Sequence, residues 1–225
     1  MHLSYHGGFG ARAHASARSA QISELELVLA IDVSGSVDRE EFARQINWPS
    51  AAFRSEDIIH LIKKTGQRGA IHVTVAQWSG EPHQAQAVPW TRLLDRTSAL
   101  SFTEAIDGTR RRLKFYSNAI GNALVFSRQL FAQRPGTCRR RVVDVSGDGA
   151  SNEGPGAGAI RDWLVAENVT VNGLGIRGSQ PELDQYYRDN VIGGEASFLI
   201  TAESFRDFPA AVRRKLLREI APPIS

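Results

Sequence analysis

One stretch of the sequence restricts the fold more than any other. The run from Leu25 to Ile31 is almost entirely apolar, and it ends abruptly at Asp32. A continuous apolar run of this length is typical of a strand that is buried on both faces, as the central strand of a parallel sheet is. The chain is therefore expected to cover both faces of such a sheet with other elements.

The rest of the chain alternates between patterns typical of strands and of helices. Ile71 to Trp78 alternates in the manner of a strand, and Gln84 to Trp90 is typical of a shorter strand at a sheet edge. Asp38 and Glu41 resemble a helix-capping pair, and Pro49 must break or restart the helix that follows them. The other expected strands cover residues 141–146, 169–176 and 197–201, and the other expected helices include residues 53–64, 97–113, 119–132, 163–167, 181–187 and 204–219. This alternation predicts the α/β class, with a doubly wound, mostly parallel central sheet flanked by helices.

No linker and no shift of composition divides the chain. We therefore expect one domain over residues 24–221, with an N-terminal tail at residues 1–23 and a C-terminal tail at residues 222–225. Residues 17–20 resemble the end of a signal peptide, but the apolar middle region of a signal peptide is missing. We interpret the N-terminal tail as disordered or as a remnant signal segment. A truncated signal would place the protein in the periplasm or outside the cell, and otherwise the cytoplasm is expected.

Composition argues against several classes of protein. No apolar run approaches the length that a transmembrane helix needs, and the single cysteine, Cys138, rules out an intramolecular disulfide. The formal net charge is +3, and arginines gather in short clusters at residues 110–112, 139–141 and 213–214. No aromatic residues are interleaved with these clusters to stack on bases. We interpret the clusters as solvated ends of helices and strands, and we expect no nucleic-acid partner.

Two acidic residues mark the ends of predicted strands. Asp32 follows the first strand, and Asp148 follows the strand at residues 141–146. Ligands of open α/β sheets bind at the carboxyl ends of strands, near the point where the strand order reverses. Ser34 and Ser36 follow Asp32 at alternate positions of a glycine-containing turn, so their hydroxyl groups are expected to point the same way.

Carboxylate and hydroxyl oxygens are the ligands that hard cations prefer. We therefore expect a divalent cation at this place, magnesium first, with manganese or calcium as alternatives. So few charged ligands would leave coordination positions for water or for a carboxylate from outside. The simpler alternative is that Asp32 and Ser34 only form a turn capped by a side chain.

These residues resemble a known family. The segment Asp32-Val33-Ser34-Gly35-Ser36 matches the Asp-x-Ser-x-Ser motif of the metal-ion-dependent adhesion site in von Willebrand factor type A (vWA) domains. The segment Val145-Ser146-Gly147-Asp148-Gly149 resembles the Asp-Gly pair at a later strand end of that family. The resemblance covers nearly the whole chain from Glu24 onward, and it implies a vWA fold.

The second metal-binding loop departs from the pattern of the family. The family places a Thr before a helix that starts with Gly-x-Ala-Leu, and here residues 121–124 align with that start and place Asn118 where the Thr is expected. An Asn carbonyl oxygen can ligate a hard cation, and Ser117 offers an adjacent hydroxyl group. The resemblance therefore implies the metal ligands Asp32, Ser34, Ser36, Asn118 and Asp148. Asn118 leaves the occupancy of the site and the choice of metal open.

More narrowly, the chain resembles an uncharacterised bacterial branch of the vWA family. This resemblance depends on the first motif together with residues 77–80, 144–149, 186–187 and 190–194. That branch has no known reaction, so the resemblance implies a fold and a site and leaves the function to be argued.

A binding module fits the residues better than an enzyme does. Ser34 stands where a phosphatase with an aspartyl nucleophile needs its second carboxylate, and neither His72 nor His83 stands in a recognisable triad. The sequence also contains no Gly-x-Ser-x-Gly elbow and no Gly-x-x-x-x-Gly-Lys loop. We therefore predict a non-enzymatic module of the adhesion or assembly type, whose cation holds an acidic residue of a partner protein. The alternatives are a metal-dependent hydrolase of phosphate esters and a vWA-like interaction domain that no longer binds metal.

Overall fold

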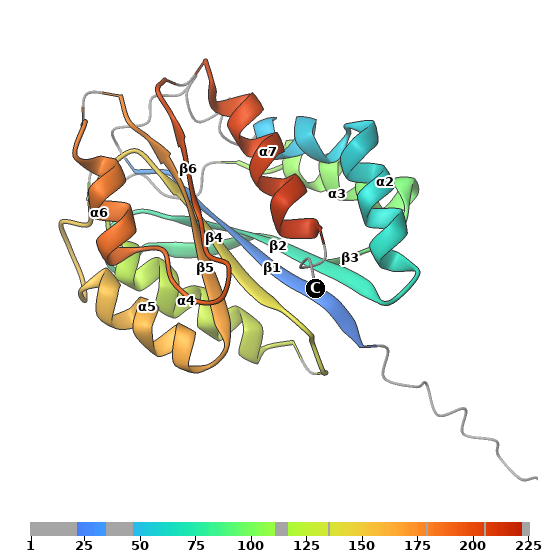
Figure 1. Cartoon of the computed structure of the whole chain (residues 1–225), viewed down its shortest axis with the longest axis horizontal. Helices are drawn as coiled ribbons and strands as arrows, with labels where there is room; N and C mark the ends of the chain where they lie inside the picture. Colours follow the sequence, from blue (N-terminus) through green and yellow to red (C-terminus); the bar gives the residue numbers. More distant parts are fainter. Residues whose placement is uncertain are drawn as a thin grey trace, which may run out of the picture.

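The structure is built around one six-stranded sheet. The computed structural model describes residues 22–34, 47–110, 117–134, 136–178, 180–204 and 206–221. The strand order is β3-β2-β1-β4-β5-β6, and each neighbouring pair is parallel except the antiparallel pair β2–β3 (Figure 1). The strands are β1 (Ser23–Asp32), β2 (Ala70–Trp78), β3 (Gln84–Leu93), β4 (Arg141–Gly147), β5 (Val169–Ile176) and β6 (Leu199–Ala202).

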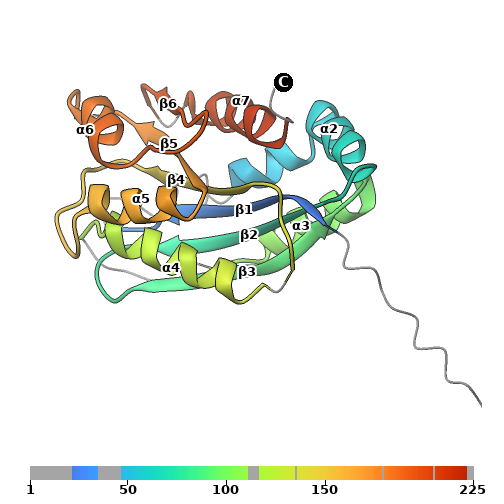
Figure 2. The ribbon, with the colours of Figure 1, turned by 60° about the horizontal axis from the view of Figure 1, so that its bottom comes forward.

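Helices cover both faces of this sheet. Helices α2 (Glu56–Gly66), α3 (Arg96–Asp107) and α7 (Phe208–Ile220) pack on one face, and α4 (Ile120–Ala132), α5 (Ala157–Ala166) and α6 (Leu183–Asn190) pack on the other. Figure 2 shows α4, α5 and α6 grouped on the left of the view and α2, α3 and α7 grouped on the right. A further helical segment at residues 47–53 precedes α2. This arrangement confirms the doubly wound α/β fold predicted from the alternation of patterns.

Strand β1 is buried on both faces, as its apolar run predicts. Alternate residues face the two cores: Leu25, Leu27, Leu29 and Ile31 on the side of α2, α3 and α7, and Val28 and Ala30 on the side of α4, α5 and α6. None of these six side chains is more than 4% exposed. Full burial of one Leu, Ile or Val contributes roughly 1.5–3 kcal/mol, so β1 anchors both cores.

The edge strand β3 is longer than predicted. It was expected to stop at Trp90, but it continues past Pro89 to Leu93. Proline cannot donate a hydrogen bond to a neighbouring strand, which is tolerable at the edge of a sheet, where one side has no neighbour. The pairing with β2 shifts register on both sides of Val75, close to this proline.

Helices α3 and α7 differ from their predicted bounds. Helix α3 ends at Asp107, where Gly108 caps it, and not at Leu113. Helix α7 begins at Phe208 with a proline in its first turn, and not at Ser204. Proline at the start of a helix lacks only an N–H group that would have no partner there anyway, so it favours this later start.

Some predicted features lie outside the described residues. These are residues 1–21 of the predicted N-terminal tail, the helix expected after Asp38 and the predicted C-terminal tail at residues 222–225. In the ranges that are described, no helix is both long enough and apolar enough to cross a membrane.

The topology places a ligand crevice between β1 and β4. The chain passes from β1 to β2 on one side and reaches β4 and β5 on the other, so the strand order reverses between β1 and β4. The parallel register pairs Ile31 with Ser146, and the residues that follow these two therefore leave the sheet side by side. Those residues include Asp32 and Asp148, so the fold brings the two predicted acidic ligands to the switch point.

Candidate metal site

Asp32 closes β1 with a fully buried carboxylate. Its Oδ1 atom accepts a hydrogen bond of 2.7 Å from the amide of Ser34, which forms the side-chain-capped turn considered above. Its Oδ2 atom is buried and has no hydrogen-bond partner among the described residues. The turn therefore accounts for one oxygen of Asp32 and leaves the other for a different partner.

The structure describes only one of the two serines of the first motif. Ser34 is fully buried, and its amide and hydroxyl groups both hydrogen-bond to the Asp32 carboxylate. Ser36 lies outside the described residues, so its part in the site stays a prediction.

Asp148 lies close enough to Asp32 to affect its ionisation. Burial, first, and the negative charge of Asp148, second, raise the pKa of Asp32 from 3.8 to about 7. Hydrogen bonds from Ser34 and from the amide of Asp148 oppose this rise. Two carboxylates that repel each other at the ends of adjacent strands form an arrangement that a cation stabilises.

Asn118 is brought to the loop that follows β4. Its backbone N–H group donates to Oδ1 of Asn152 at 2.9 Å. Its backbone carbonyl oxygen accepts from the backbone N–H group of Asn152 at 2.9 Å and from the hydroxyl group of Ser151 at 3.1 Å. Its Nδ2 atom lies 2.5 Å from the point that a Cβ on Gly149 would occupy. Its Oδ1 atom is buried and has no hydrogen-bond partner in the described part of the chain.

The hydroxyl group of the neighbouring Ser117 already has a hydrogen-bond partner. Its hydroxyl group hydrogen-bonds to the Glu153 carboxylate and is the main cause that lowers the pKa of Glu153. The amide of Glu81 also donates to that carboxylate, at 3.2 Å. Ser117 therefore helps to tie the β2–β3 hairpin to the loop after β4, whereas the side-chain oxygen of Asn118 has no hydrogen-bond partner within the described ranges. Of the two candidates in the second loop, the local hydrogen bonding favours Asn118 as the ligand.

Asn152 was expected from the sequence to shape the rim of the site, whereas sequence reasoning missed the part that Ser151 has in holding this loop in place. Ser151 and Asn152 bind the backbone of Asn118 from the loop after β4, and Ile120 at the start of α4 donates to Ser151 Oγ at 3.2 Å. The only sequence signal was their nearness to Asp148, because hydrogen bonds between distant loops leave no periodic pattern.

The described donors are mixed in type. No three His, Cys, Asp or Glu side chains among the described residues converge as a metal site. The candidate set therefore combines the carboxylates of Asp32 and Asp148 with hydroxyl and amide oxygens. Such an all-oxygen set suits magnesium, manganese or calcium.

Comparison with protein families identifies one family. A family model described as "Protein of unknown function (DUF1194)" matches residues 21–224. The chain belongs to the DUF1194 family. No curated protein matches it.

Solved structures show that this DUF1194 chain has a vWA-like fold, as the first motif predicted. It resembles proximal thread matrix protein 1 of the mussel byssus, solved with a zinc-occupied MIDAS motif, with a TM-score of 0.64 and 16% identity over 88% of this chain and 46% of that chain. It also resembles a von Willebrand factor type A protein of Catenulispora acidiphila, with a TM-score of 0.61 and 16% identity over 88% of this chain and 43% of that chain. This chain therefore spans about half the length of either structure.

A third structure matches over almost its whole length. The vWF domain of the type V pili tip protein Mfa5 from Porphyromonas gingivalis has a TM-score of 0.59 and 9% identity over 91% of this chain and 98% of that chain. Identities this low establish the fold alone. The assignment of ligands in the DUF1194 chain therefore depends on its own geometry.

Proposed function

We propose that this chain is a metal-dependent protein-binding module. A divalent cation held by Asp32, Ser34, Ser36, Asn118 and Asp148 would accept a carboxylate from a partner protein at an open coordination position. The observation that carries the proposal is the charge balance of the buried carboxylates.

Four carboxylate side chains are buried in the described part of the chain: Glu26, Asp32, Asp144 and Glu219. Three of these have cationic partners: Glu26 pairs with Arg134 and Arg141, and Asp144 and Glu219 pair with Lys215. Asp32 has no ion-pair partner among the described residues. Burial of an unpaired carboxylate is costly, so the exception at Asp32 favours a cation from solution as its partner.

The unused oxygen atoms support the same conclusion. Oδ2 of Asp32 and Oδ1 of Asn118 are buried acceptors without partners in the described ranges. Buried acceptors are normally satisfied, and a hard cation satisfies carboxylate and amide oxygens alike. We expect magnesium, because it accepts a few protein oxygens and keeps its remaining positions for water or for a ligand.

The charge of the loaded site is compatible with a carboxylate as the outside ligand. Two aspartates balance a divalent cation, so an incoming carboxylate meets no excess negative charge at the metal. The related folds are consistent with a protein-binding role, because they include a domain of a pilus tip protein and a matrix protein of the mussel byssus.

Titration with Mn²⁺, which substitutes for Mg²⁺, tests the site first. Isothermal calorimetry on the full chain should show one site, and Asp32→Asn should weaken it by more than the roughly 10- to 100-fold that loss of an outer-shell contact costs. Asp189→Asn is the matched control, because Asp189 is exposed on α6, and it should leave the affinity unchanged. An absence of saturable binding by the wild-type chain would support the interaction domain that binds no metal.

A second experiment tests the partner chemistry. Immobilised peptides that contain an aspartate, and the same peptides with asparagine, should be compared with Mg²⁺ and with chelator. Capture that needs both the carboxylate and the cation supports the proposal, whereas capture that chelator does not affect contradicts it. Turnover of p-nitrophenyl phosphate with added Mg²⁺ or Mn²⁺, lost in Asp32→Asn, would instead establish the hydrolase.

A further inference from the structure

Three buried side chains meet around one glycine of β4, and each has a polar atom without a hydrogen-bond partner among the described residues. A Cβ on Gly147 would lie 2.9 Å from Oη of Tyr187, 3.1 Å from Oδ2 of Asp32 and 3.3 Å from Cζ2 of Trp78. All three side chains are at most 1% exposed. Oη of Tyr187, Oδ2 of Asp32 and Nε1 of Trp78 each lack a hydrogen-bond partner among the described residues.

These groups are complementary in hydrogen bonding. The ionised Asp32 carboxylate only accepts hydrogen bonds, whereas the indole N–H group of Trp78 only donates, and a tyrosine hydroxyl group can donate. Oη of Tyr187 and Oδ2 of Asp32 are at most 6.0 Å apart, which is the sum of their distances from the Cβ point on Gly147. One water molecule hydrogen-bonded to both atoms spans a distance of this size. If the two atoms lie closer together, a small rotation of the side chains brings them into direct hydrogen-bonding contact.

We infer that Tyr187 is a positioning residue for the cation site: its hydroxyl group donates a hydrogen bond to Oδ2 of Asp32, directly or through one water molecule, and so orients the carboxylate toward the metal. The inference rests on the proposed function. Oδ2 has two acceptor positions, so one can take this hydrogen bond while the other faces a cation. Asp32 would then be held from both sides, by Ser34 at Oδ1 and by Tyr187 at Oδ2.

The surrounding fold is built to keep these groups together. Tyr187 is on α6, Asp32 ends β1 and Trp78 ends β2, so three elements distant in sequence supply them. Gly147 leaves open the space between them, because any larger residue would place its Cβ within contact of two of the oxygens. A tyrosine that served only to fill the core would gain nothing from a hydroxyl group buried in this place.

The hydroxyl group alone is removed by Tyr187→Phe. We expect Mn²⁺ affinity to fall about tenfold, the lower end of the range for outer-shell partners, because Trp78 can still donate. The electron paramagnetic resonance spectrum of bound Mn²⁺ should also broaden, since a less restrained carboxylate distorts the coordination. The melting temperature in chelator should fall by no more than roughly 2–4 °C, because the aromatic ring is kept and the loss of one hydrogen bond costs only about 1 kcal/mol.

Tyr186→Phe is the matched control. It removes the same group from the adjacent, partly exposed residue of α6, whose ring contacts that of Tyr187 at 6.3 Å between centroids, and it should change neither the affinity nor the spectrum. Wild-type affinity in Tyr187→Phe, while Asp32→Asn loses binding, would overturn this inference and leave the proposed function intact. A fall in the chelated melting temperature of Tyr187→Phe well beyond the roughly 2–4 °C that one hydrogen bond accounts for would show a structural role and overturn it as well. If the wild-type chain binds no Mn²⁺, the proposed function fails and this inference fails with it.

Discussion

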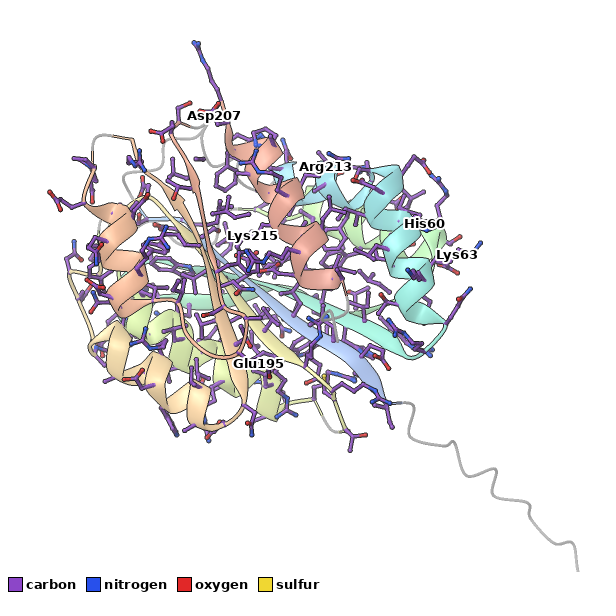
Figure 3. The ribbon with its side chains drawn as sticks, in the orientation of Figure 1. His60, Lys63, Glu195, Asp207, Arg213 and Lys215 are labelled. Atoms are coloured by element: carbon purple, nitrogen blue, oxygen red, sulfur yellow. The ribbon has the colours of Figure 1, made fainter. Side chains whose placement is uncertain are left out.

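The buried lysine of α7 offers the sharpest test of how this fold is stabilised. Lys215 is fully buried between α7 and the sheet (Figure 3). Its ammonium group contacts Asp144 of β4 and lies 3.1 Å from Oε1 of Glu219. Asn172 of β5 donates to the same Glu219 oxygen at 3.0 Å, so α7 is joined to two strands by one polar network.

Replacement of this lysine by methionine keeps the length of the side chain and removes the charge. The pKa of Glu219 is raised to about 7, chiefly by burial and then by Asp144, so Glu219 can protonate when its cationic partner is lost. Asp144 then remains as a buried carboxylate without a cation. Breaking a buried ion pair from one side costs about 3–5 kcal/mol. We expect Lys215→Met to lose that amount of unfolding free energy.

The loss is measured by urea unfolding at pH 7 in chelator, followed by tryptophan fluorescence. A destabilisation of about 3–5 kcal/mol lowers the melting temperature of a chain of this size by roughly 6–20 °C. The control is Lys63→Met, because Lys63 is exposed on α2 (Figure 3), and it should stay within about 0.5 kcal/mol of the wild type.

The double variant Asp144→Asn/Lys215→Met separates the charge from the packing. It removes the carboxylate that Lys215→Met leaves without a cation, so it should be more stable than Lys215→Met by several kcal/mol, on the order of the whole loss. A single variant within about 1 kcal/mol of the wild type, or a double variant no more stable than the single one, would show that the charges are not what holds α7 to β4.

Two other results are expected. The raised pKa of Glu219 means that the folded chain holds a proton that the unfolded chain has released, so this group's contribution is fully present below about pH 4.5 and falls by about 3 kcal/mol as the pH rises to about 7. In chelator, Glu219→Gln should make the unfolding free energy depend less on pH in this range, whereas Glu104→Gln on the exposed side of α3 should not. If Glu219→Gln and the wild type show the same slope of unfolding free energy against pH, Glu219 is not the group responsible. Gly147→Ala should abolish or strongly weaken Mn²⁺ binding, because its Cβ would lie 3.1 Å from Oδ2 of Asp32; calorimetry that shows unchanged affinity would mean that the loop moves aside without consequence.

The fold could be predicted from the sequence because its strongest signals are local. The run from Leu25 to Ile31 identified the central strand, and most other elements were found within a few residues of their observed bounds. One error occurred where tertiary context decides, because the edge position of β3 tolerates Pro89. The end of α3 was placed too late although its cap, Gly108, is a local feature of the sequence.

The candidate site could be predicted only in part. Asp32 and Asp148 were recognisable because the ends of parallel strands meet at one edge, and the structure places them together. Tyr187 could not be assigned, because its distance from Asp32 depends on how α6 packs on β4 and β5. The burial of Lys215 and its ion pairs could not be predicted either, since a lysine in an amphipathic helix usually faces solvent. Whether metal binds, and with Ser36 as a ligand, stays a prediction.

Asp144 on β4 and Asp148 just after this strand suit two different roles, one in stability and one in the proposed binding. Asp144 faces α7 and forms an ion pair with Lys215, so its charge is neutralised by another part of the chain when the chain folds. Asp148, at the end of the strand, lies beside Asp32, which has no such internal cation in the described part of the chain. A lysine beside Asp32 would have stabilised the empty fold, but it would also have closed the site to an ion from solution. A cation bound there as proposed would instead link folding to occupancy, because a cation at 100 times its dissociation constant stabilises the folded state by about 2.7 kcal/mol. A partner that contributes a further ligand would therefore meet a domain already stabilised by its metal.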